Sequence, residues 1–161
     1  MVNVLFLCTG NSARSILAEA LLGTLGQGRF NAFSAGSQPA GSVQPIAIEL
    51  ARELGYPVER LRSKSWDAFA VTDAPAIDIV ITVCDNAAAE SCPIWPGHPA
   101  TAHWGVPDPA AVNGDDKARR HAFVVAMATL RRRVELLVAL PVEKLDRLAV
   151  QGKLRDIAAN A

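Results

Sequence analysis

The chain opens with Val2-Asn-Val-Leu-Phe-Leu7, continues with Cys8-Thr-Gly-Asn-Ser-Ala-Arg14-Ser15 and runs on into Ile16-Leu-Ala-Glu-Ala-Leu-Leu22. The first run is almost wholly apolar, which is typical of a strand covered on both faces of a parallel sheet. The last run has helical periodicity. Because a buried strand, a short polar loop and a helix in this order open a βαβ unit, the stretch predicts an α/β fold.

The loop between strand and helix brings a thiol, turn-forming residues and a guanidinium together. Gly10, Asn11 and Ser12 tolerate tight or left-handed turns. A helix N-terminus offers unpaired N–H groups and a positive dipole end, both of which favour a bound anion. The same field favours the thiolate of Cys8, and Arg14 can bind two oxygens of one ligand. The loop therefore predicts an oxyanion site with Cys8 as nucleophile, formed by Thr9, Gly10, Asn11, Ser12, Ala13, Arg14 and Ser15.

Strands and helices alternate along the rest of the chain. Apolar runs predict strands at 29–34, 77–83 and 101–104, and periodicity predicts helices at 13–25, 43–54, 116–140 and 142–158. We expect a single-domain, doubly wound, four-stranded parallel sheet with helices on both faces, whose carboxyl edge carries Cys8 and Cys84. Because Pro141 breaks the long helix, we expect a catalytic domain at 1–140 and a C-terminal helical extension at 141–161, packed on or beside it.

The overall composition limits the classes of partner. Sixteen basic and sixteen acidic residues balance, which removes any general attraction to nucleic acid or an anionic membrane. Three cysteines, an odd number, do not suggest a secreted disulfide framework, and the N-terminus resembles a strand rather than a leader. We therefore expect a cytoplasmic monomer. Arg131-Arg132-Arg133 is expected to be a solvated face of the long helix.

A second chemical signal lies in Trp104-Gly-Val-Pro-Asp-Pro109. An aspartate between two prolines is held on a rigid turn, where it can donate or accept a proton over a site. The alternative for Asp108 is a simple Asx turn. Beside the oxyanion loop, the catalytic interpretation is favoured.

These motifs together resemble the low-molecular-weight protein tyrosine phosphatase family and, within it, the arsenate reductase branch. The resemblance covers about residues 2–138 and rests on the Cys8 to Ser15 loop, Ser34-Ala-Gly36, Val83-Cys84 with Cys92-Pro93, and His103-Trp104-Gly105 leading into Asp108-Pro109-Ala110. It implies that Cys8 attacks arsenate, that Arg14 holds the oxygens and that Asp108 assists proton transfer. Phosphate and sulfate are the competing oxyanions it implies.

The resemblance also implies a relay of three thiols. Cys84 would attack Cys8 and release arsenite, after which Cys92 would attack Cys84 and carry the disulfide to a reductant. Thioredoxin is the expected reductant, and no bound cofactor or metal is expected. The spacing of Cys84 and Cys92 is one residue wider than in some relatives, so glutaredoxin with glutathione or another thiol stays open.

Three other interpretations compete with the relay. A phosphatase acting on phosphotyrosine or small phosphoesters would need only a Cys8 thiophosphate, although Ala110-Ala111 supplies no aromatic wall for a tyrosyl group. A binding module could keep the oxyanion loop without turnover. A zinc site lacks paired ligand spacing, since its donors would be Cys84, Cys92, His98 and His103.

Two positions depart from the family pattern. Ala13 stands where the best-known members carry a loop cysteine outside the relay. Some relatives bind potassium through Asn, Glu, Ser and Asp; Asn11, Glu19 and Ser34 match, but Lys64 takes the place of the Asp. We expect the ammonium of Lys64 to replace the cation and tether Asn11, which would make activity insensitive to potassium.

Overall fold

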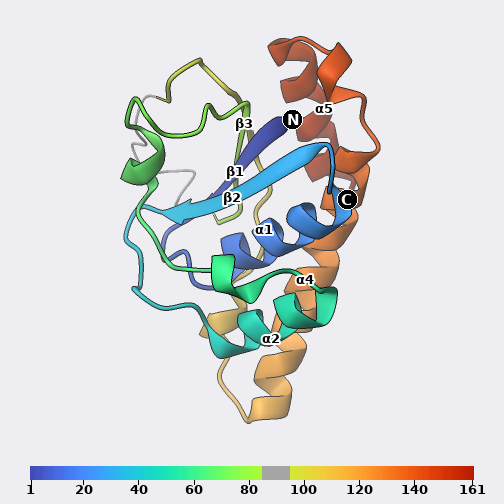
Figure 1. Ribbon diagram of the computed structural model, residues 1–161. Helices are drawn as coiled ribbons and strands as arrows, with labels where there is room; N and C mark the ends of the chain where they lie inside the picture. The colour runs from blue at the N-terminus through green and yellow to red at the C-terminus, as the bar shows by residue number, and fades with distance from the viewer. Residues whose placement is uncertain (85–94) are drawn as a thin grey trace.

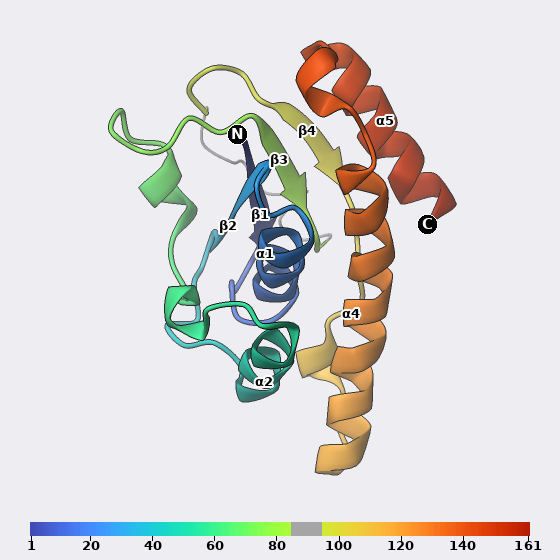
Figure 2. The same ribbon diagram turned by 45° about the vertical axis from the view of Figure 1, so that its right-hand side comes forward.

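The computed structural model describes residues 1–84 and 95–161. At its centre lies a parallel sheet in the order β2-β1-β3-β4, formed by β1 (Val2–Cys8), β2 (Phe30–Gly36), β3 (Ile79–Thr82) and β4 (Ala100–His103). Figure 1 labels the first three strands, and Figure 2 labels all four. The α-helices among the described residues are α1 (Arg14–Leu25), α2 (Pro45–Leu54), α4 (Asp116–Val138) and α5 (Arg147–Asn160). Short 3-10 helices are η1 (Val58–Arg60), η2 (Trp66–Phe69), η3 (Pro109–Ala111) and η4 (Val142–Lys144). The predicted α/β class and the four parallel strands are confirmed.

Side chains of β1 alternate between two apolar layers because successive residues of a strand point to opposite faces. Val4 and Phe6 lie in the main core, which also takes in α1, α4 and α5. Figure 2 shows α4 and α5 along one side of the sheet. Leu5 and Leu7 point to the other face, which η2 covers through Phe69. The central strand β1 is therefore buried on both faces, as its apolar run predicts.

The structure moves two predicted helix boundaries. The helix expected at 43–54 begins at Pro45, because proline suits the first helical turn, where its missing N–H is not needed. The helix expected at 142–158 is wrong in its first turns. Residues 142–144 form η4, and α5 begins after Asp146, whose side chain accepts a hydrogen bond from the backbone N–H of Ala149.

The C-terminal segment contributes to the main core. Val150, Leu154 and Ile157 of α5 are buried in it. The indole Nε1 of the fully buried Trp104 donates to the carbonyl of Leu154 over 3.0 Å. Packing and hydrogen bonding thus join α5 to the chain just after β4, whereas the division of the chain at residue 140 stays a prediction.

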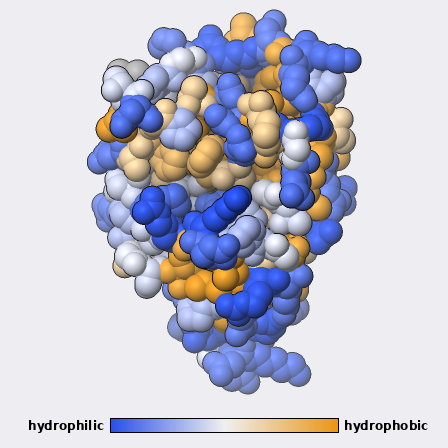
Figure 3. All heavy atoms as spheres, in the orientation of Figure 1, coloured by the Kyte–Doolittle hydropathy of each residue, from blue (hydrophilic) through white to orange (hydrophobic). Residues whose placement is uncertain are grey.

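The surface contradicts one expectation about charge. Arg131 and Arg132 are exposed, but Arg133 is half-buried and donates from Nη1 to the carbonyl of Gly105 over 3.1 Å, so the triple-arginine run is not one solvated face. Figure 3 shows hydrophilic and apolar side chains mixed over the face in view. In the parts of the chain that the structure describes, no helix is both long and apolar enough to cross a membrane.

Candidate active site

Cys8 is the last residue of β1 and is buried at the start of the loop. Its Sγ lies 2.8 Å from Ser15 Oγ and accepts from the backbone N–H of Asn11 over 3.2 Å. The Nδ2 of Asn11 donates to the same Ser15 Oγ over 2.8 Å. The Ser15 hydroxyl accepts from Asn11, and its own hydrogen can point to a deprotonated sulfur. The Asn11 N–H and the Ser15 hydroxyl thus both lie within hydrogen-bond distance of Cys8 Sγ.

Asn11 holds the loop in a conformation that few residues adopt. Its φ is 46°, in the left-handed region, which asparagine tolerates better than most side chains. Its Oδ1 accepts from the backbone N–H of Lys64 over 2.9 Å, and the residue is fully buried. The loop carbonyls are bound elsewhere, since Thr9 O and Gly10 O accept from the backbone N–H groups of Gln38 and Ala40, each over 2.9 Å. These acceptors do not compete with an oxyanion for the loop's donors.

Gly36, at the end of β2, lets that strand approach the loop. A Cβ atom at this position would lie within 3.0 Å of the carbonyl oxygen of Thr9 and 3.0 Å from both Cys8 O and Asn11 N. All three are backbone atoms, so none can rotate away. The loop's position thus depends on a glycine one strand away.

Arg14 and Asp108 meet in front of the loop. Arg14 begins α1, and its Nη1 donates to the carbonyl of Val106 over 3.0 Å. Its Nη2 lies 3.7 Å from Asp108 Oδ2, with side-chain exposures of 17% for Arg14 and 41% for Asp108. Asp108 Oδ1 also accepts from the N–H of Ala110 over 2.9 Å and so caps η3. Asp108 makes the Asx-type bond and still places its carboxylate beside the guanidinium of the oxyanion loop.

Cys84 lies just beyond β3 and close to the same loop. Its Sγ is 3.6 Å from Thr9 Oγ1, the hydroxyl of the residue after Cys8. Cys8 and Cys84 are both buried. This places two thiols at the carboxyl ends of neighbouring strands, where ligands bind in such sheets. Cys92, the third predicted thiol, lies outside the described residues.

The other donors of the zinc alternative do not gather at a site. His98 is exposed in a loop, and the ring of the exposed His103 lies 2.8 Å from Thr82 Oγ1. Within residues 1–84 and 95–161, no group of three or more histidine, cysteine or acidic side chains could hold a metal ion.

A buried carboxylate lies in α1, about one helical turn beyond the loop. Glu19 of α1 is 3% exposed and accepts from Ser34 Oγ and from the hydroxyl of Tyr56, each over 2.6 Å. Burial, with the nearby negative charge of Glu19, raises the pKa of Tyr56, so this phenol remains a donor. Tyr56 follows Gly55 at the end of α2 and belongs to no motif, so the sequence did not reveal it.

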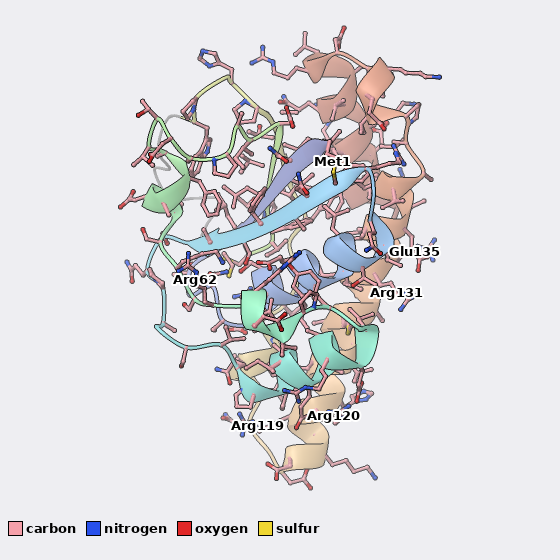
Figure 4. All side chains as sticks on the ribbon, viewed as in Figure 1. Met1, Arg62, Arg119, Arg120, Arg131 and Glu135 are labelled. Carbon is pink, nitrogen blue, oxygen red and sulfur yellow. The ribbon has the colours of Figure 1, made fainter. Side chains whose placement is uncertain are left out.

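Lys64 reaches this carboxylate but not in the expected way. Its Nζ donates to Arg62 O over 3.0 Å and lies 3.5 Å from Ser34 Oγ and 3.8 Å from Glu19 Oε1. Burial lowers the pKa of Lys64, and the charge of Glu19 opposes that shift. The backbone N–H of Lys64, and not its ammonium, donates to Asn11. The expected contact between the ammonium and Asn11 is therefore wrong. Figure 4 labels Arg62 near the carboxyl end of β2.

A comparison of the whole sequence with known families agrees with these structural features: the strand order, the cysteine loop and the pairing of Arg14 with Asp108. A family model described as low molecular weight phosphotyrosine protein phosphatase matches residues 3–150. The chain belongs to this family.

Several members of this phosphatase family that resemble the chain are arsenate reductases. The one from Bacillus licheniformis is 36% identical over 116 residues, which are 72% of this chain and 80% of that protein. A solved arsenate reductase in an oxidized state is 28% identical with a TM-score of 0.68, over 86% of this chain and 98% of that one. A thioredoxin-dependent arsenate reductase from Corynebacterium glutamicum is 27% identical with a TM-score of 0.57, over 85% of this chain and 63% of that one.

The structure brings four of the predicted catalytic side chains to one edge of the sheet: Cys8, Arg14, Cys84 and Asp108. Their roles in turnover stay predictions. Sequence reasoning missed the close approach of Gly36 and the support of Glu19 by Tyr56. Only Gly36 left a signal, as a glycine at the end of a predicted strand, directly beside the loop's own strand.

Proposed function

We propose that the chain reduces arsenate to arsenite by a thiol relay. One observation carries the proposal: a second buried cysteine, Cys84, lies 3.6 Å from the hydroxyl of Thr9 in the oxyanion loop. Hydrolysis of a phosphoester in this fold needs one thiol, whereas the reduction of arsenate needs two electrons and hence a thiol pair. The arsenate reductases among the relatives support the same substrate.

In the first step the thiolate of Cys8 attacks arsenic while Arg14 and the loop N–H groups hold the arsenate oxygens. An As–O bond breaks, and that oxygen leaves as water after proton transfer assisted by Asp108. The product is a Cys8 thiol-arsenate adduct. The 3.7 Å contact between Arg14 and Asp108 puts the anion-binding group and the proton-transfer group next to each other.

In the second step the thiolate of Cys84 attacks Cys8 Sγ. The S–As bond breaks and its electron pair stays on arsenic, which leaves as arsenite, while Cys8 and Cys84 form a disulfide. Cys92 then attacks Cys84 and frees Cys8. A dithiol of thioredoxin reduces the Cys84 to Cys92 disulfide and becomes oxidised itself. The thioredoxin-dependent relative supports this reductant, and a reducing, cytoplasmic compartment suits the three thiols.

Steady-state turnover tests the relay. Arsenate reduction is measured with thioredoxin, thioredoxin reductase and NADPH for the wild type and for Cys8→Ser, Cys84→Ser and Cys92→Ser. All three variants are expected to lose multiple turnover, because each removes one thiol that the cycle must regenerate. Full turnover in Cys84→Ser or Cys92→Ser would refute the relay. Replacing thioredoxin by glutaredoxin with glutathione in the same assay identifies the reductant.

Phosphoester hydrolysis is the second candidate because it would use the same Cys8, Arg14 and Asp108. The two residues after Pro109 are Ala110 and Ala111, which offer no ring to pack against a tyrosyl group. We therefore expect weak hydrolysis of simple aryl phosphates as a side activity. Its loss in Cys8→Ser alone, with retention in the other two cysteine variants, would show that both reactions share the first step.

A further inference from the structure

The turn that carries Asp108 is poor in hydrogen-bond donors. Pro107 and Pro109 have no N–H, so this segment cannot be fixed by a regular backbone ladder. Its two preceding carbonyls are instead each bound by an arginine from a different helix. Gly105 O accepts from Nη1 of Arg133 in α4 over 3.1 Å, and Val106 O accepts from Nη1 of Arg14 in α1 over 3.0 Å.

Arg133 is an unusual side chain for the middle of α4. It is half-buried next to the buried Val134, and burial lowers the pKa of its guanidinium, which nevertheless stays charged. Its Nε is buried and has no hydrogen-bond partner in the described part of the chain, where no carboxylate lies within ion-pair distance of it either. Desolvating a guanidinium is unfavourable. The hydrogen bond to Gly105 O is therefore the contact that compensates for the partial burial of Arg133.

The base of the turn is fixed independently. The backbone N–H of Trp104 donates to Thr82 O over 2.7 Å and that of Val106 to Val83 O over 3.1 Å. Beyond Val106, η3 is closed by the backbone N–H groups of Ala111 and Val112, which donate to Asp108 O over 3.2 Å and to Pro109 O over 3.4 Å. The Asp108 side chain caps η3 and contacts Arg14. Arg14 has a second task, since a bound oxyanion draws on the same guanidinium.

We propose that Arg133 is a positioning residue for Asp108. It holds the turn through Gly105 O, so that the Asp108 carboxylate keeps its place beside the oxyanion loop when an oxyanion binds the guanidinium of Arg14. Arg133 touches no reacting atom. The catalytic consequence rests on the proposed proton transfer by Asp108, whereas the ordering of the turn does not.

Three variants test this role in the full chain. Arg133→Met removes the donors and keeps the aliphatic stem, Arg133→Lys restores one donor, and Arg132→Met is the matched control at an exposed neighbour. Amide hydrogen exchange across residues 104–112 is expected to rise about tenfold in Arg133→Met. Arg132→Met is expected to match the wild type, and Arg133→Lys to lie between the two.

Single-turnover and hydrolysis kinetics provide the second measurement. In Arg133→Met, arsenite release in a single turnover is expected to slow by about tenfold. The arsenate concentration that gives half the maximal rate is expected to change by less than about twofold. Hydrolysis of an aryl phosphate with a weakly acidic phenol is expected to fall more than that of one with a strongly acidic phenol. Only the weakly acidic phenol needs a proton to leave, so general loss of folded protein would slow both equally.

Unchanged exchange in Arg133→Met would overturn the proposal, as would raised exchange with wild-type rates for both the weakly acidic phenol ester and arsenate. Equal slowing of the two esters would assign Arg133 a purely structural role and also overturn it. If the wild type releases no arsenite, the proposed function fails. Amide hydrogen exchange and the hydrolysis of the two esters then still test whether Arg133 positions Asp108. If the esters are not hydrolysed either, exchange alone decides whether Arg133 holds the turn.

Discussion

Replacing Gly36 by alanine should damage the oxyanion loop from outside it. The added Cβ would lie within 3.0 Å of Thr9 O, a separation that real Cβ atoms essentially never show, and 3.0 Å from Cys8 O and Asn11 N. Since all three are backbone atoms, β2 and the loop must move apart by several tenths of an ångström. Overpacking of this kind costs about 1–3 kcal/mol. For a chain of this length that lowers the Tm by roughly 2–12 °C.

The same displacement moves the donors around Cys8 Sγ. A misplacement of this size lowers turnover by about 10- to 100-fold. Thermal unfolding and single-turnover arsenite release measure the two effects. Gly152→Ala is the matched control, because its Cβ would meet only Arg155 Nη2 at 4.0 Å within a helix. That change should stabilise by about 0.5–1 kcal/mol and leave turnover unchanged. A Gly36→Ala protein with wild-type Tm and wild-type turnover would refute the close-approach reasoning.

Three further outcomes are expected. Turnover in KCl and in NaCl of equal ionic strength should agree within about 1.5-fold, because the Lys64 ammonium already lies 3.8 Å from Glu19. In Lys64→Asp, turnover should rise with potassium. A clear potassium stimulation of the wild type would contradict this. Asp108→Asn keeps the oxygen that caps η3 and should slow the first step by about 10²- to 10⁴-fold, which full single-turnover rates would disprove. The hydrogen bond from Arg29 lowers the pKa of Glu143 from 4.5 to about 2. The stability that this bond contributes is therefore present above about pH 4.5 and is lost as the pH falls toward 2. The free energies of unfolding of wild type and Glu143→Gln, measured in urea, should converge in acid, and a constant difference between them would count against this.

The parts of the fold that could be predicted are those in which neighbouring residues carry the information. The apolar run of β1, the small polar residues after it and the periodic α1 are contiguous, so strand, loop and helix follow from local pattern alone. The start of α5 was misplaced because the apolar residues 142 and 145 continue the helical pattern, although they pack around η4. The cap at Asp146 marks the true beginning.

The supports of the site could not be predicted because they join residues far apart in the chain. Tyr56 reaches Glu19 across 37 positions, and Arg133 reaches Gly105 across 28. An isolated tyrosine and one arginine of three in a row have no local signature of burial. Only the packing of α4 against the segment after β4 separates Arg133 from the exposed Arg132 beside it.

The relay itself is tested most directly by one measurement. The reduced chain is mixed with arsenate in the absence of any reductant, its remaining thiols are blocked, and arsenite and disulfide-linked peptides are quantified. The account predicts one arsenite per chain with a disulfide between Cys84 and Cys92, and a trapped disulfide between Cys8 and Cys84 in Cys92→Ser. Arsenite release with all three thiols still free, or a disulfide that leaves out Cys84, would contradict it.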